Sequence, residues 1–86
     1  MELYKRKDIP WRIVDKEALV VDPHSSLVYP FNRVAARIWQ LLDGTHGLQE
    51  IADIIYNEFE ADKKMVVEDT GNFISQLKEA RLIERL

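Results

Sequence analysis

Residues 32–44 read Asn-Arg-Val-Ala-Ala-Arg-Ile-Trp-Gln-Leu-Leu-Asp-Gly, and the hydrophobic period of the chain changes within this stretch. Its apolar residues recur at the spacing i, i+3, i+4 and i+7, which is typical of an amphipathic helix. These residues are Ala35, Ile38, Trp39 and Leu42. Asn32 is a suitable N-cap and Gly44 a suitable stop, so the stretch predicts a helix over about residues 32–43.

The residues before this helix alternate turn residues with short β-branched and aromatic runs, which predict strands. We expect strands over about residues 11–15, 18–22 and 26–30. The connection Asp22-Pro23-His24-Ser25 favours a turn, because proline fixes φ and aspartate bonds its own backbone downstream. Pro30 cannot donate to a ladder, so the third strand should end there or lie at an edge. The pattern predicts a three-stranded antiparallel meander.

The residues after Gly44 are helical in period. We expect a second helix over about residues 48–59 and a third over about residues 63–81, with Asp62 as its cap. A small sheet and amphipathic helices must bury their apolar faces together, so Trp39 and Phe73 are assigned to the core. The predicted fold is α+β and winged-helix-like, a meander followed by a three-helix bundle in one domain over residues 1–86.

The composition limits the classes of function. The chain has 86 residues, 47% hydrophobic and 31% charged, which is typical of one globular domain. It has no cysteine, which removes disulfides, thiolate catalysis and the common structural zinc sites. A net charge of −3 disfavours non-specific binding to nucleic acid or anionic lipid. No membrane span or signal peptide is evident, so we expect a cytoplasmic protein.

No group of residues predicts catalysis, a metal or a cofactor. His24 and His46 are isolated in sequence, and we expect both to be solvated loop residues. The acidic cluster at the end of the second helix lacks the spacing of a calcium loop, and no phosphate-binding glycine loop is present. We therefore expect that the protein is not an enzyme and has no cofactor.

A three-helix unit beside a small sheet is also the plan of winged-helix DNA-binding proteins. The basic residues of the third helix are offset by acidic ones, which repel phosphates along a groove. The basic set is Lys63, Lys64, Lys78 and Arg81, and the acidic set is Glu68, Asp69 and Glu79. DNA binding thus remains an alternative, as does a protein–protein adaptor that modifies no peptide.

Several segments resemble coenzyme PQQ synthesis protein D (PqqD) and its relatives. The most specific is the pattern Asn-x-x-Ala-Ala-x-Ile-Trp-x-Leu-Leu-Asp-Gly at residues 32–44. The other matching positions are Leu19–Pro23, Tyr29–Asn32, Glu50–Ala52, Asp69, Phe73, Ile74, Leu77, Leu82 and Ile83. The chain departs from the family at Gly47, where threonine is frequent, and at Phe31, where leucine is usual.

The resemblance implies a RiPP recognition element, a domain that holds the leader segment of a ribosomally made precursor peptide. A partner, often a radical S-adenosylmethionine enzyme, modifies the rest of the peptide in pyrroloquinoline quinone or other RiPP biosynthesis. The family fold is three strands followed by three helices. We accordingly expect a non-catalytic peptide chaperone whose partners are a leader peptide and a modifying enzyme.

A binding mode follows from the physics of a meander, because a free edge strand can pair with an extended peptide. In the family, the leader pairs with the third strand and lies beside the third helix. The implied contacts are Leu27, Val28 and Tyr29 on the strand, and Val67, Ile74, Lys78 and Arg81 on the helix. Val67 and Ile74 are spaced equally well for core packing. Alternation places Leu27 and Tyr29 on one face and Val28 on the other.

Overall fold

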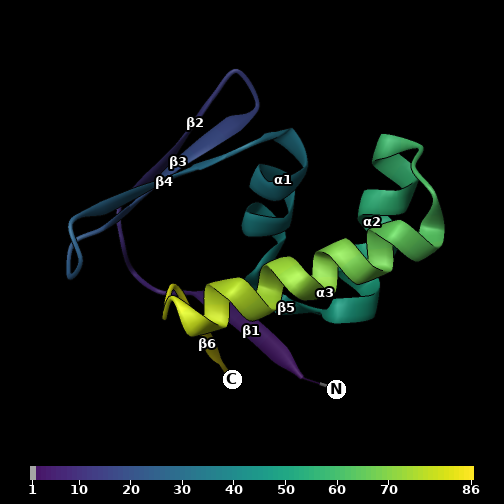
Figure 1. Ribbon diagram of the computed structural model, residues 1–86. Coiled ribbons are helices and arrows are strands. Elements are labelled where there is room, and N and C mark those ends of the chain that lie inside the picture. The colour runs from purple at the N-terminus through teal and green to yellow at the C-terminus, as the bar shows by residue number, and fades with distance from the viewer. Residues whose placement is uncertain (1) are drawn as a thin grey trace.

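A computed structural model describes residues 2–86, which form three helices and two three-stranded sheets (Figure 1). The strands are β1 (Leu3–Arg6), β2 (Trp11–Val14), β3 (Glu17–Asp22), β4 (Leu27–Phe31), β5 (Asp43–Gly47) and β6 (Ile83–Arg85). The helices are α1 (Arg33–Leu41), α2 (Leu48–Phe59) and α3 (Lys63–Glu79). The predicted α+β class, with an antiparallel meander and three helices, is confirmed.

The meander consists of β2, β3 and β4, in that order across the sheet. Asp15 and Lys16 form a two-residue turn between β2 and β3, and both have positive φ, 50° and 68°, as a tight hairpin requires. In the next turn Asp22 accepts hydrogen bonds from the backbone N–H of His24 and the hydroxyl of Ser25. These bonds hold the β3–β4 turn, as the aspartate and serine of the sequence predict.

A second sheet, in the order β5-β1-β6, was not predicted. The sequence pattern gave three strands followed by three helices, whereas β1 precedes the meander and β5 interrupts the helices. Gly44 does not stop α1, because Leu42 is the C-cap and residues 43–47 form β5. The three strands of the second sheet are short and pair with segments distant along the chain, such as Leu3 with Gly47 and Tyr4 with Arg85.

Arg6 joins this second sheet to α1. Its Nη1 donates to the carbonyls of Trp39 and Gln40, both at 2.7 Å. The last turn of α1 has no basic residue of its own. The backbone N–H of Arg6 donates to the carbonyl of Leu42. A cation that satisfies the last carbonyls of a helix stabilises it, so β1 supplies the C-terminal cap of α1.

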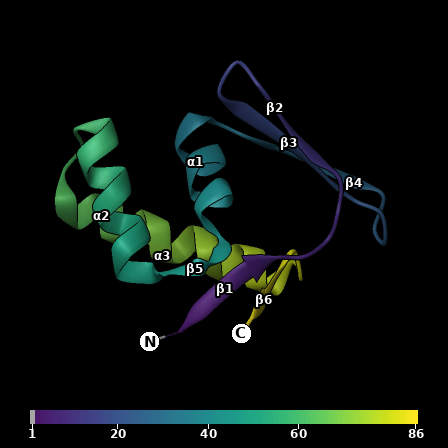
Figure 2. The same ribbon diagram turned by 180° about the vertical axis from the view of Figure 1, so that it is seen from behind.

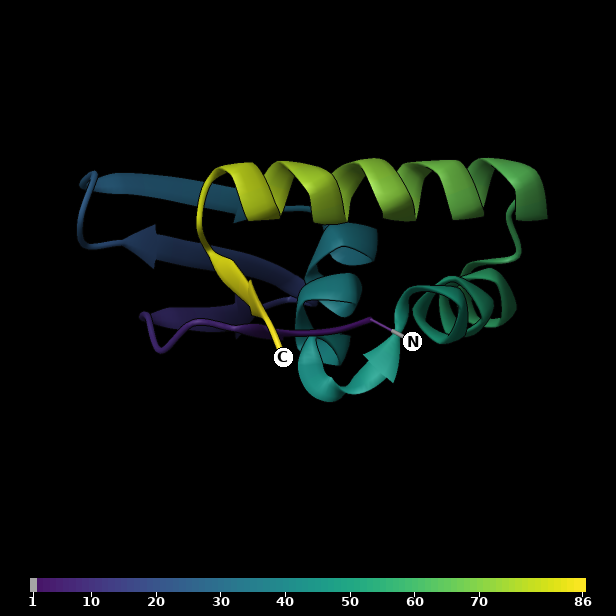
Figure 3. The ribbon, with the colours of Figure 1, turned by 90° about the horizontal axis from the view of Figure 1, so that it is seen from below.

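The core joins the meander to the helices through edge-to-face aromatic contacts. The ring centroid of Trp39 lies 6.2 Å from that of Trp11 and 5.7 Å from that of Phe31. The ring of Phe31 in turn lies 5.1 Å from Phe73 of α3. Trp39 is fully buried and Phe73 is half-buried against the core. Figure 3 shows α1, which carries Trp39, between the meander and α2.

The third helix ends two residues earlier than expected. Asp62 caps its start, as predicted, by accepting from the N–H groups of Lys64 and Met65. At the other end the N–H of Leu82 bonds to the carbonyl of Leu77, and Arg81 adopts φ 60°. This Schellman arrangement turns the chain into β6 beside β1, which brings the two ends of the described chain together (Figure 2).

No helix in residues 2–86 is both long enough and apolar enough to cross a bilayer.

Candidate functional site

One side of β4 has no neighbouring strand. The order β2-β3-β4 leaves β4 at the border of the meander, and Figure 3 shows it on the same side of the molecule as α3. An edge strand presents backbone groups that can pair with an added chain. The free side of β4 is therefore the candidate site.

The register identifies which backbone groups of β4 point outward. Val21 donates its N–H to Pro10 on the β2 side, so the groups of Val21 and Leu19 point away from β4. Antiparallel pairs alternate between bonded and non-bonded, so the opposing residues Val28 and Pro30 do not bond to β3. Val28 consequently directs both its N–H and its C=O toward the open side, and Pro30 directs its C=O there. The groups of Tyr29 and Phe31 are used inside the sheet.

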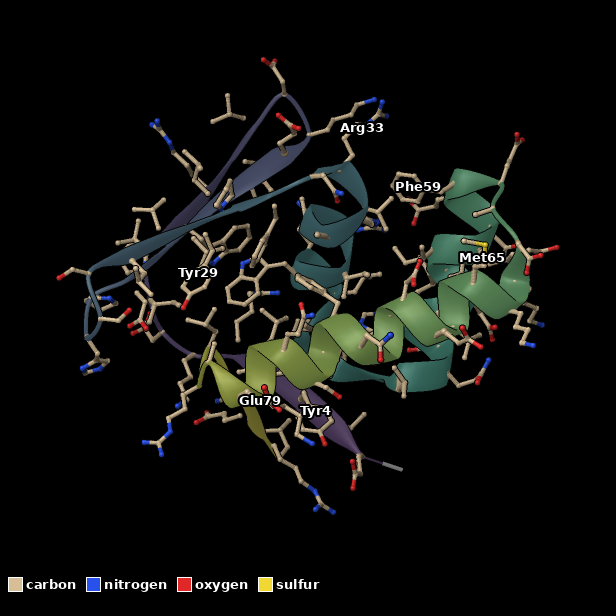
Figure 4. All side chains as sticks on the ribbon, in the orientation of Figure 1. Tyr4, Tyr29, Arg33, Phe59, Met65 and Glu79 are labelled. Carbon is tan, nitrogen blue, oxygen red and sulfur yellow. The ribbon has the colours of Figure 1, made fainter. Side chains whose placement is uncertain are left out.

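The side chains of β4 divide between the two faces of the meander. Tyr29 and Phe31 share the core face with their partners Val20 and Ala18, whereas Val28 and Pro30 point to the outer face. Leu27 is 54% exposed and Val28 is 55% exposed, which is unusual for apolar strand residues. Tyr29 is half-buried and extends from β4 toward the C-terminal half of α3 (Figure 4).

Helix α3 faces this edge, and its Phe73 ring contacts Phe31 of β4. Residues one or two turns from Phe73 lie on the same side of a helix, which adds Asp69, Gln76 and Ala80 to the wall. Asp69 and Gln76 are exposed, and Ala80 is half-buried. The wall of α3 beside β4 is therefore an aromatic ring flanked by polar and small side chains. The sequence assigns Phe73 to the core alone, whereas the structure places it, half-buried, on this wall.

The helix residues expected beside β4 lie elsewhere. Val67, Ile74 and Lys78 line a hollow of about 390 Å³ on the side of α3 that faces α2 and β1, together with Tyr4 and Leu48. Tyr4 and Tyr29 lie on opposite sides of α3 (Figure 4). Ile74 is only 5% exposed and belongs to the core. The Nζ of Lys78 lies 5.1 Å from the centroid of the Tyr4 ring.

This placement differs from the expected groove. Successive helix residues are rotated by about 100°, so Ile74 points well away from its neighbour Phe73. Val67 and Lys78 are rotated further in the same direction. Arg81 lies beyond the end of α3, in the left-handed conformation, and is exposed. The basic rim expected from Lys78 and Arg81 is thus not assembled on the wall that contains Phe73.

His46, one of the two histidines considered as possible metal ligands, has structural contacts. His46 is half-buried in β5, not a solvated loop residue, and its Nδ1 lies 3.1 Å from the Leu41 carbonyl and 3.1 Å from Asp43 Oδ1. The Thr45 hydroxyl donates to Asp43 and, as the main cause, lowers the pKa of that carboxyl to about 2. Within residues 2–86, no three His, Asp or Glu side chains are grouped to hold a metal.

Comparison with known proteins gives a family match and several similar structures. The family model described as coenzyme PQQ synthesis protein D (PqqD) matches residues 17–83. The structure of TbiB1 in complex with the TbiA(beta) leader peptide is 27% identical, with a TM-score of 0.82 over 93% of this chain and 94% of that one. A comparison with curated proteins gives no match.

Two further structures show the same fold at lower identity. Lasso peptide synthetase B1, complexed with the leader peptide, is 22% identical with a TM-score of 0.81, covering 94% of this chain and 96% of that one. The PqqD truncation of Methylobacterium extorquens PqqCD, described as a stand-alone RiPP recognition element, is 18% identical with a TM-score of 0.74. That match covers 95% of this chain and 88% of the other.

Proposed function

This chain belongs to the coenzyme PQQ synthesis protein D family, and we propose that it binds the leader segment of a ribosomally made precursor peptide and presents it to a modifying enzyme. The observation that supports this most directly is the free side of β4, where Val28 offers an unpaired N–H and C=O. The role requires the compartment in which precursor peptides are synthesised, the cytoplasm.

The comparisons support the same function. The structure of TbiB1, which shares 27% identity over nearly the whole chain, is that of a complex with a leader peptide. The two less similar proteins agree in fold. In this proposal the domain contributes binding and orientation, and the covalent chemistry belongs to a separate enzyme.

The mechanism is addition of a strand. The incoming segment pairs with the outward groups of Val28 and Pro30, and its alternate side chains face the space beside Tyr29 and Phe73. Main-chain bonds give affinity that depends little on sequence, while the aromatic wall selects side chains that fit it. Leu27 and Tyr29 lie on the same face of β4 as this wall, so they are the strand residues proposed to contact the peptide.

The test is calorimetric titration with the TbiA(beta) leader peptide, the ligand in the TbiB1 structure. Val28→Pro removes the outward N–H without removing a bond inside the meander, and the Val28 side chain is exposed. We expect affinity to fall about tenfold or more, because a backbone bond is lost and an incoming carbonyl is left without a partner.

Ile13→Pro is the matched control. Ile13 lies on β2, the opposite border of the sheet, is 38% exposed, and pairs with Ala18 in a non-bonded position. Its N–H points outward in the same way, so this variant tests the general cost of a proline in an edge strand. We expect leader affinity within about twofold of wild type. Equal loss in both variants, or unchanged affinity in Val28→Pro, would contradict the proposed site.

A further inference from the structure

The free side of β4 is chemically asymmetric. Between residues 27 and 31 it offers the N–H of Val28 and the carbonyls of Val28 and Pro30, which makes one donor and two acceptors. The missing donor is the N–H that proline lacks. Ser26, which precedes β4, has its N–H bonded to the Asp22 carbonyl. An added chain therefore meets more acceptors than donors.

We propose that Pro30 prevents this edge from pairing with the same edge of a second copy of the chain while allowing it to pair with a foreign extended peptide. The inference rests on the proposed function, since it names the class of strand that the same edge accepts. That class is a peptide with free N–H groups at two alternate positions, opposite Val28 and Pro30. Proline is excluded at both of these positions of the peptide.

Pairing between two copies can be worked out from the register. In an antiparallel pair centred on Tyr29, Val28 of one copy lies opposite Pro30 of the other. With an N–H at position 30, each such pair would exchange two bonds, giving four in total. With proline, only the two Val28 N–H groups are used, and both Val28 carbonyls face a pyrrolidine ring. Half of the possible bonds are lost, and two acceptors remain unpaired.

A second symmetric register is no better. When the pair is centred on Val28, the two Val28 residues exchange two bonds, and Pro30 lies opposite Ser26 of the other copy. That serine has already committed its N–H to Asp22, and its φ of 62° is not that of a strand. The same edge of a second copy thus obtains two bonds in either of these two registers.

A foreign strand has no such restriction. Its residue opposite Val28 can exchange two bonds, and its residue opposite Pro30 can donate a third, so all three outward groups of β4 are satisfied. The difference between three bonds and two favours the foreign chain over the same edge of a second copy.

The composition of β4 makes this device necessary. Edge strands usually avoid self-association through charged side chains, proline, bulges or short length. Residues 27–31 read Leu-Val-Tyr-Pro-Phe, with no charge, and two of their apolar side chains are more than half exposed. Pro30 is the one protective residue among these five.

The experiment uses Pro30→Val in the full chain. Because Pro30 is exposed and lies in a non-bonded pair with Leu19, the substitution adds a donor and breaks no bond within the meander. Sedimentation velocity from about 10 µM to about 1 mM should show wild type as a monomer and the variant self-associating about tenfold or more strongly. Pro23→Val, in the exposed β3–β4 turn, controls for loss of a proline and should remain monomeric.

The double variant Pro30→Val with Val28→Pro identifies the interface. It again leaves one donor per edge, so association should return to the wild-type level. The proposal is overturned if Pro30→Val stays monomeric while circular dichroism shows it folded, or if its association persists in the double variant. Neither measurement involves the leader peptide, so failure of leader binding to the wild-type chain would instead count against the proposed function.

Discussion

The two sheets protect their edges in different ways. In the sheet β5-β1-β6 the edge strand β6 is three residues long and includes Glu84 and Arg85, and the other edge strand, β5, is polar. Shortness and charge discourage pairing with another chain. In the meander, β4 is apolar and exposed and relies on Pro30. The sheet β5-β1-β6 therefore resists an added strand, whereas the meander has a side that can accept one.

The sheets also differ in how they form. The meander pairs neighbours along the chain through two tight turns, whereas β1 pairs with strands about 40 and 80 residues away. Distant pairings cost loop-closure entropy and therefore need anchors. Arg6, which bonds to the carboxyl end of α1, is such an anchor. The second sheet consequently holds the fold together, and the meander presents the site.

The largest expected effect is a loss of stability on replacing the anchor, Arg6. Arg6→Met should lower the free energy of unfolding by about 2 kcal/mol, since a charged group that bonds to two carbonyls is lost. The melting temperature should fall by about 10 °C for a domain of this size. Leader affinity at 20 °C should stay within about twofold, because the site lies on the other sheet.

Lys5→Met is the control on the neighbouring residue. Lys5 pairs with Glu84 at 3.5 Å, and both side chains are about half exposed, so its removal should cost below about 0.5 kcal/mol. Chemical denaturation of both variants gives the comparison. Equal stability of Arg6→Met and Lys5→Met would show that the second sheet has no such anchor.

A smaller, opposite effect is expected where α3 turns into β6. Arg81 has φ 60°, a conformation that glycine adopts at less cost. Arg81→Gly should therefore raise the free energy of unfolding by about 0.5–1 kcal/mol, after allowing for the greater freedom of glycine in the unfolded chain. Arg81→Asn should lie between the two. Urea denaturation measures the series, and a destabilised glycine variant would contradict it.

The smallest effect concerns the pKa of Asp43 in β5, which the Thr45 hydroxyl and backbone and His46 lower to about 2 from an ordinary value of 3.8. A lowered folded pKa gives stability that is present above 3.8 and is lost as the pH falls toward about 2. Thr45→Val should raise this pKa toward its ordinary value and flatten the loss of stability in that window. An NMR titration of the Asp43 carboxyl measures it, and an unchanged midpoint would contradict the assigned cause.

The part of the fold that is local in sequence could be predicted. The meander follows from alternating runs and the Asp22-Pro23 turn, and α1 follows from its apolar spacing and the Asn32 cap. Strands β1 and β6 could not be predicted because each has at most four residues and its partners are distant. Strand β5 reads Asp-Gly-Thr-His-Gly, which is typical of a turn, and only pairing with β1 makes it a strand.

For the candidate site, the sequence indicates the strand side more clearly than the helix side. A meander must have free edges, and Pro30 indicated which strand lies at one of them. The helix side differs from the expectation because Val67 and Ile74 face β1 and α2, and the sequence does not predict β1. Because α3 covers β1 as well as the meander, its apolar stripe is wider than a single packing contact requires. Phe73 then becomes the residue that faces β4.

The most direct test of the account is amide hydrogen exchange, followed residue by residue by NMR in the free protein and in the presence of saturating leader peptide. In the free protein, the N–H groups of Tyr29 and Phe31 should be protected by β3, and the Val28 N–H should exchange rapidly. Bound peptide should protect Val28 at least about tenfold, and leave the Ile13 N–H on the opposite border unchanged. A Val28 amide that is already protected without peptide, or that exchanges equally fast with peptide bound, would contradict strand addition at β4.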